Sequence, residues 1–153
     1  MPEMQSLRVK DAMTTRTTRI RQDASMYRAA EVVALSRVSD LMVVGEDDQF
    51  IGVLSEGDIL RAALPDVDEI TAEGGSLDTA FSIFLKKGKD LSALPILPFV
   101  ITEPIALDPQ DHVAKAATVM IDRNIRLLPV VKDGKLVGTI SRADVCQTVV
   151  GNL

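Results

Sequence analysis

One polar pattern occurs twice in the chain: a glycine, two residues, a serine, two residues and an aspartate. The first copy contains Ser55 and Asp58, and the second, 86 residues later, contains Ser141 and Asp144. A serine at a strand-to-helix corner lies beside unpaired N–H groups and the positive end of the helix, where a phosphate can bind. The aspartate, one turn further on, offers two acceptor oxygens, which suit a vicinal diol such as a ribose 2′,3′-hydroxyl pair. The pattern is therefore typical of a small-ligand site.

The same four residues also have a simpler interpretation as helix caps. A serine at the N-cap with an aspartate three positions later is nearly a capping box, and such a box needs no ligand. A single copy of the pattern would favour the cap. Two copies in one chain, together with the resemblance described below, favour a ligand.

Residues that could carry catalysis are scarce. His112 is the only histidine and Cys146 the only cysteine. The polar surroundings of His112 predict an exposed side chain, and the amphipathic stretch around Cys146 predicts a buried thiol rather than a nucleophile. No His/Cys cluster has zinc spacing, and the paired carboxylates at 47–48 and at 66 and 68 fall in a turn and a linker. We expect no enzymatic activity, no metal and no catalytic cofactor.

The elements that must position the repeated pattern are themselves duplicated. The helical segment that starts at Met26 matches the one that starts at Val113, 87 residues later. The one-residue difference from the offset of 86 falls in a turn, where 45–49 faces the shorter 132–135. Hydrophobic periodicity gives both halves the order β-α-β-β-α. The predicted strands are 17–21, 41–44, 50–54, 104–107, 127–131 and 135–140, and the predicted final helices are 56–63 and 142–149.

Short polar signals set the expected ends of these elements. Ser25 is predicted to cap the first long helix, and Asp111 the corresponding helix of the second half. The Asp133-Gly134 pair predicts a hairpin between the last two strands.

The connector, residues 65–95, contains a predicted helix that begins after Ser76. Its apolar residues form one stripe that either packs on the rest of the chain or binds a partner, and packing is the expected role. The stripe consists of Leu77, Phe81, Phe84 and Leu85.

Composition excludes several classes of protein. The 153 residues include 22 acidic and 17 basic side chains, a net charge of −5, whereas proteins that bind nucleic acid through phosphate contacts carry the opposite sign. Only 3% of residues are aromatic, which leaves little to stack on bases. The chain has no apolar run of membrane-spanning length, and residues 1–6 lack the features of a secretory signal. We therefore expect a cytoplasmic protein that binds neither nucleic acid nor membranes.

Both halves resemble cystathionine-β-synthase (CBS) domains, and the whole chain resembles a stand-alone tandem CBS pair, or Bateman module. The resemblance is carried by Ile125-Arg-Leu-Leu-Pro-Val-Val-Lys-Asp-Gly-Lys-Leu-Val-Gly-Thr-Ile-Ser-Arg-Ala-Asp and by the lead-in segment Val9-Lys-Asp-Ala-Met-Thr. It covers a first domain at 8–64 and a second at 96–150. The implied fold is α/β (α+β), with two pseudo-symmetric β-α-β-β-α units packed through their small sheets and a partly helical connector.

The resemblance also implies a function. CBS pairs often bind adenine nucleosides or nucleotides, including AMP, ADP, ATP and S-adenosylmethionine, as regulatory ligands in clefts between the domains, and commonly form homodimers that act on an effector protein. The alternative is a ligand-free module for dimerisation or interaction. Matched residue by residue to the family, the candidate ligand-binding residues are Thr17, Thr18, Met42, Val44, Ser55, Asp58, Pro104, Ile105, Arg126, Leu128, Val130, Ser141, Arg142 and Asp144. Among them, the aspartates would bind ribose, the serines phosphate or the polar tail of the ligand, and the arginines phosphate. The threonines, Pro104 and Ile105 would lie on the strands that line the base, and the other apolar residues would form the walls of the clefts.

Overall fold

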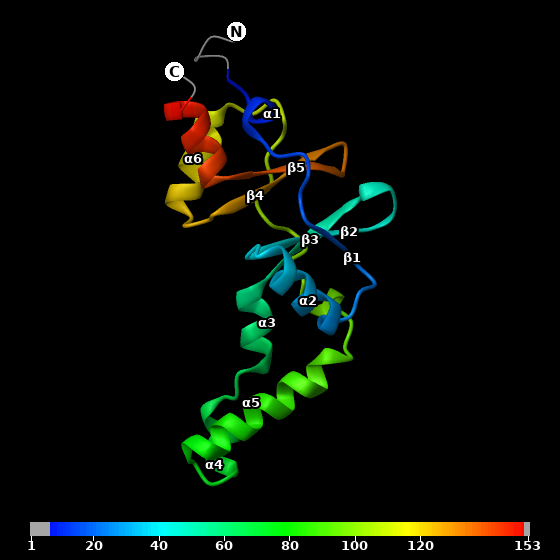
Figure 1. The fold of residues 1–153 in the computed structure, drawn as a ribbon, viewed down its shortest axis with the longest axis vertical. Helices are drawn as coiled ribbons and strands as arrows, with labels where there is room; N and C mark the ends of the chain where they lie inside the picture. The colour runs from blue at the N-terminus through cyan, green and yellow to red at the C-terminus, as the bar shows by residue number, and fades with distance from the viewer. Residues whose placement is uncertain (1–6, 152–153) are drawn as a thin grey trace.

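The computed structural model describes residues 7–151, and residues 1–6, on which the expectation about a secretory signal rests, lie outside that range. The chain forms two halves stacked along the long axis of the molecule, with a helical connector at one end (Figure 1). The first half contains α1 (Val9–Ala12), β1 (Arg19–Arg21), α2 (Met26–Ser36), β2 (Asp40–Val44), the 3-10 turn η2 (Glu46–Asp48), β3 (Phe50–Ser55) and α3 (Glu56–Ala63). The connector contains α4 (Val67–Ala72) and α5 (Leu77–Ser92). The second half contains η3 (Leu97–Phe99), α6 (Val113–Asp122), β4 (Leu127–Lys132), β5 (Lys135–Ser141), α7 (Arg142–Cys146) and the π-helical turn η4 (Gln147–Gly151).

Each half is built on its own small sheet. In the first half β1 is parallel to β2, and β2 is antiparallel to β3. In the second half β4 and β5 form an antiparallel pair, joined at Asp133 and Gly134, which both have positive φ. Positive φ at both positions is what a tight hairpin turn requires, so the predicted Asp-Gly hairpin is confirmed.

Alternation along β2 explains how the two halves pack. Leu41 and Val43 point into the core of the first half, whereas Met42 and Val44 form a separate buried cluster with Leu136 of β5. Successive side chains on a strand face opposite sides, so one strand serves both the core of its own half and the contact with the other half. The expected packing of the units through their sheets is therefore present.

The predicted strand at 104–107 is not formed. Only Leu107 pairs, through its N–H to the carbonyl of Pro129 (2.9 Å) and its carbonyl to the N–H of Val131 (2.8 Å). Pro104 has no backbone N–H, which limits pairing along this segment. The predicted cap of α6 is also displaced by one residue. His112, not Asp111, is the N-cap, and its Nδ1 accepts a hydrogen bond from the N–H of Ala114 (2.9 Å).

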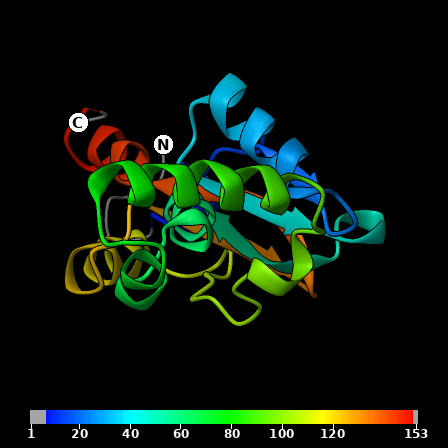
Figure 2. The same cartoon turned by 90° about the horizontal axis from the view of Figure 1, so that it is seen from below.

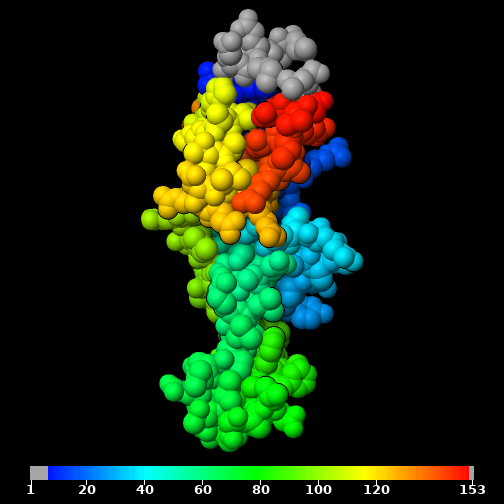
Figure 3. Space-filling view, turned by 90° about the vertical axis from the view of Figure 1, so that its left-hand side faces the viewer, coloured from blue at the N-terminus to red at the C-terminus, as the bar shows by residue number. Residues whose placement is uncertain are grey.

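The connector forms a helical hairpin, and its apolar stripe is largely uncovered. Ser76 caps α5 as predicted. Phe84 packs against the core of the first half, but Leu77, Phe81 and Leu85 are 89%, 63% and 57% exposed, so the expected packing of the stripe holds only for Phe84. The hairpin projects beyond the end of the first half and is joined to it by a narrower part of the molecule (Figures 1 and 3). Seen from that end, α5 lies across the molecule (Figure 2).

Two further side chains differ from expectation. The thiol of Cys146 is exposed rather than buried, and His112 is half-buried rather than exposed. None of the helices within residues 7–151 is both long and apolar enough to span a membrane.

Candidate functional site

The two copies of the polar pattern lie at equivalent strand-to-helix corners. We call Ser55 and Asp58, at the start of α3, the first corner, and Ser141 and Asp144, at the start of α7, the second corner. In both, the serine oxygen accepts from the aspartate N–H (3.0 Å). The aspartate Oδ2 in turn accepts from the serine N–H, at 3.2 Å in the first corner and 2.8 Å in the second. Both capping boxes are thus formed without a ligand, and each leaves the aspartate Oδ1 outside the box.

The second corner is completed by a residue from the other half. Thr14 precedes β1, yet its hydroxyl lies 3.3 Å from Oδ1 and 3.4 Å from Oδ2 of Asp144. Its backbone pairs with Thr139 on β5 through hydrogen bonds of 2.8 and 2.9 Å. The lead-in segment of the first half therefore crosses to the second and brings a hydroxyl to a carboxylate 130 residues away in sequence.

Near the first corner, the second half makes the same kind of backbone crossing. Ile101 pairs with Val53 on β3 through backbone hydrogen bonds of 2.9 and 3.0 Å. Ile101 follows Thr14 by 87 residues, the offset of the sequence repeat. The two corners are thus related by pseudo-twofold symmetry, but a threonine occupies this position in one and an isoleucine in the other.

Glycines at the crossing points allow the close approach. A Cβ at Gly52 would lie 2.2 Å from the carbonyl oxygen of Ile101, and one at Gly138 would lie 2.7 Å from that of Thr14. Real Cβ contacts are never this short. The glycine of the repeated pattern therefore makes room for the lead-in segment, a role that the spacing alone did not indicate.

The two aspartates differ in their charged surroundings. Arg61 lies one turn after Asp58, and its guanidinium donates to Oδ1 at 2.6 Å. The Ser55 hydroxyl also donates to Oδ2 of Asp58 at 2.8 Å. Burial raises the pKa of Asp58, but the hydrogen bonds from Ser55 and Arg61 outweigh it and hold the pKa below its ordinary value. Within residues 7–151, the ion pairs of the structure do not include Asp144.

The predicted apolar walls are buried in two different places. Met42 and Val44 lie between the two sheets. Leu128 and Val130 instead lie in the core of the second half, packed with Met120 of α6 and 1% and 0% exposed. Strand alternation explains the difference: these two residues are on the face of β4 that points away from the first half. These two side chains therefore pack in the core of their own half, and their expected role as cleft walls stays a prediction.

The two predicted arginines occupy different environments. The guanidinium of Arg142 donates to the carbonyls of Met120 and Ile125 (both 3.0 Å) and to Oδ1 of Asn124 (3.3 Å). Arg142 thus covers the carboxyl end of α6, and its expected role in phosphate binding stays a prediction. Arg126 is exposed and close enough to Asp40 for its charge to act on the pKa of that carboxyl.

The remaining predicted residues follow the two crossing residues, Thr14 and Ile101, in the sequence. Thr17 and Thr18 are half-buried between Thr14 and β1. Pro104 is half-buried and Ile105 is 39% exposed, both in the irregular segment before Leu107. Three further residues at the corners, Thr14, Ile101 and Arg61, were not among the predicted site residues. The 87-residue offset relates the first two, and an i,i+3 spacing from Asp58 is a recognisable signal for Arg61.

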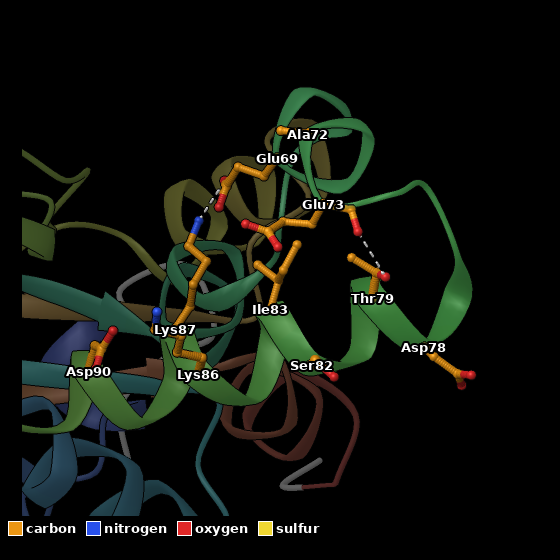
Figure 4. Close-up of a pocket in the computed structure, with 10 residues that line it drawn as sticks. All are labelled: Glu69, Ala72, Glu73, Asp78, Thr79, Ser82, Ile83, Lys86, Lys87 and Asp90. Carbon is orange, nitrogen blue, oxygen red and sulfur yellow. Dashed lines mark hydrogen bonds and ion pairs between the residues drawn. The ribbon is translucent and has the colours of Figure 1, made fainter.

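A separate hollow lies between α4 and α5, remote from both corners (Figure 4). It is lined largely by charged side chains, and Lys87 forms an ion pair with Glu69 across it at 2.9 Å. Such a partly exposed pair contributes little to stability. Because this hollow contains none of the repeated residues, we treat the corners as the candidate site.

Comparisons with known proteins agree with the duplicated architecture. The sequence model described as "CBS domain" matches residues 9–65 and 99–151. The crystal structure of CBSX2 in complex with AMP aligns with a TM-score of 0.71 at 23% identity and covers 95% of this chain and 97% of that one. A second crystal structure, of the CBS-pair protein CBSX2 from Arabidopsis thaliana, aligns with a TM-score of 0.77 at 22% identity, over 95% and 96% of the two chains.

A curated relative is longer than this chain. The uncharacterized protein MJ1225 of Methanocaldococcus jannaschii is 24% identical over 136 residues, which are 89% of this chain and 40% of the relative. At these identities the likeness to solved structures establishes the fold.

Proposed function

Because the chain belongs to the CBS domain family, we propose that it is a regulatory module that binds an adenine nucleotide, with AMP as the first candidate, at the second corner. The observation that carries the proposal is the meeting of Thr14 and Asp144 across the two halves. Among the hydrogen bonds and ion pairs of residues 7–151, Oδ1 of Asp144 has one partner, the neutral hydroxyl of Thr14 at 3.3 Å, and that hydroxyl can rotate. The carboxylate can therefore accept hydrogen bonds from the two hydroxyls of a ribose.

The nucleotide class is supported by a relative and by the chemistry of the corner. CBSX2, which shares this fold, has been crystallised in complex with AMP. A hydrogen bond from a neutral donor to a charged acceptor contributes roughly 1.5–3 kcal/mol. Asp144 would therefore supply a substantial part of the affinity for the nucleotide. ADP, ATP and S-adenosylmethionine share the adenosine group and are the other ligands to test. No step of the proposal requires catalysis or a catalytic cofactor.

A thermal-shift titration with AMP tests the proposal. A ligand at 100 times its Kd stabilises the folded state by about 2.7 kcal/mol, which for a domain of this size raises Tm by about 5–10 °C. Asp144→Ala should abolish the shift. Asp66→Ala, which removes the capping carboxylate of α4 far from the corner, is the matched control and should keep it. An equal shift in wild type and Asp144→Ala would refute the assignment, and no shift with any adenine compound would favour the ligand-free module.

We further propose that the chain forms a homodimer and acts on an effector protein. The exposed residues of the α5 stripe, Leu77, Phe81 and Leu85, support self-association, because apolar patches on soluble proteins mark interaction surfaces. Sedimentation should show a dimer for wild type and a shift toward monomer for Phe81→Glu. Leu35→Glu, at an apolar residue of α2 that is 78% exposed, is the control. A monomeric wild type would exclude the dimer.

A further inference from the structure

We infer that the two corners are not equivalent: each chain binds one nucleotide, at the second corner, and Arg61 together with Ile101 keeps a ribose out of the first. The inference rests on the proposed function and assigns its stoichiometry and the residues that decide it.

The acceptor atoms of Asp58 are already occupied. Oδ1 accepts from the guanidinium of Arg61 at 2.6 Å, and Oδ2 accepts from both the N–H and the hydroxyl of Ser55, at 3.2 and 2.8 Å. A charge-assisted hydrogen bond of this length is stronger than one from a neutral hydroxyl. A ribose at the first corner would have to compete with a cation for Oδ1, whereas at Oδ1 of Asp144 it meets the long contact from Thr14.

The residue from the opposite half adds to the difference. Thr14 brings a hydroxyl to the second corner, and this group can donate to or accept from a ligand. Ile101, at the corresponding position of the first corner, is 50% exposed and has no polar side-chain atom. A polar ligand group that faces Ile101 would lose a partner that it has at the second corner, and an unpaired polar group lowers affinity.

The duplication defines the matched substitutions. Gln147 follows Arg61 by 86 residues, the same offset that relates Asp58 to Asp144, and Thr14 corresponds to Ile101. This position is therefore occupied by a cation, Arg61, in the first half and by a neutral amide, Gln147, in the second. Arg61 is 69% exposed, so Arg61→Gln changes the charge at the corner without disturbing the core. The double variant Arg61→Gln/Ile101→Thr gives the first half the residues that the second corner has at these two positions.

Isothermal titration with AMP measures the result directly. Wild type should bind one AMP per chain, and the double variant should bind two, with affinity at the new site at least tenfold above that of the wild-type first corner. Arg61→Lys, which keeps the cation, should stay at one. Adding Asp58→Ala to the double variant should return the count to one, and Asp144→Ala in wild type should bring it to zero.

The outcomes separate this inference from the function on which it rests. Wild type that binds two AMP, with one lost in Asp58→Ala, overturns the inequivalence and leaves the proposed function standing. Wild type that binds none overturns both. If Ile101→Thr prevents folding, Arg61→Gln alone must still raise affinity at the first corner severalfold, and a fall in affinity would show that Arg61 binds the ligand instead of excluding it.

Discussion

The two crossing glycines allow one substitution to be compared at three positions. Gly52 and Gly138 lie where a lead-in segment crosses a strand of the other half, whereas Gly88 lies within α5 with no atom near the position of a Cβ. Gly→Ala adds the same methyl group in each case. We expect it to destabilise the protein strongly at 52, less at 138, and to stabilise it at 88.

The magnitudes follow from the distances. At Gly52 the new Cβ would lie 2.2 Å from the carbonyl oxygen of Ile101, so that segment must move by about 1 Å to reach an ordinary C···O contact of about 3.3 Å. The shift weakens two backbone hydrogen bonds of 2.9 and 3.0 Å between Val53 and Ile101. Losing both costs about 2 kcal/mol, and overpacking adds about 1–3 kcal/mol.

The added methyl group meets a smaller clash at Gly138 and none at Gly88. At Gly138 the distance is 2.7 Å, and the required movement is about half as large, so we expect a cost of about 1–2 kcal/mol. That movement also displaces Thr14 from Asp144 and should weaken AMP binding. At Gly88 alanine lowers the cost of forming the helix and should stabilise the protein by about 0.5–1 kcal/mol.

Urea denaturation of the three variants and wild type gives the free energies of unfolding. The order of stability should be Gly88→Ala, wild type, Gly138→Ala and then Gly52→Ala. A Gly52→Ala variant that loses less than about 1 kcal/mol, or no more than Gly138→Ala, would refute the crossing geometry on which both corners depend.

Two further predictions concern side chains near the corners. Arg142→Ala should lower the free energy of unfolding by about 1.5–3 kcal/mol and leave AMP affinity unchanged, because the guanidinium donates to the carbonyls of Met120 and Ile125. Lost AMP affinity at unchanged stability would instead support a role of Arg142 in phosphate binding. Burial, with added repulsion from Glu56 and Asp58, raises the pKa of Asp40 above its ordinary 3.8. The ionised carboxylate therefore lowers the free energy of unfolding at neutral pH, and this loss is relieved as the pH falls through the folded-state pKa. Asp40→Asn should therefore be more stable than wild type at pH 7 in denaturant titrations, with an advantage that shrinks as the pH is lowered, and an advantage independent of pH would contradict this.

Features that depend on neighbouring residues could be predicted from the sequence. Ser25 and Ser76 cap their helices as expected, because a cap needs only a side-chain oxygen and an N–H three positions later. The serine and aspartate of each corner form the capping boxes that the spacing indicated. Local chemistry of this kind is fixed by a few adjacent positions and by backbone geometry.

Contacts between the halves could not be predicted in the same way. Nothing near Thr14 in the sequence indicates that its hydroxyl reaches Asp144, because the contact depends on how two sheets stack. The exposed stripe of α5 shows the same limit: periodicity identifies an apolar face but does not tell what covers it. The placement of Leu128 was within reach, since the offset of 87 pairs Pro129, not Leu128, with Met42.

At some positions the duplicated halves diverge where divergence costs the fold little. Leu41 and Leu128 occupy equivalent positions in the two cores, and both are buried leucines, since a change of shape there creates a cavity or a clash. Arg61 and Gln147 are also equivalent, but Arg61 is largely exposed, so its side chain can change without repacking. Because that exposed position sets the charge beside Asp58, we expect one surface substitution to alter the proposed ligand binding at one corner while the core, the capping box and the crossing stay the same. Selectivity between the corners can thus evolve independently of stability.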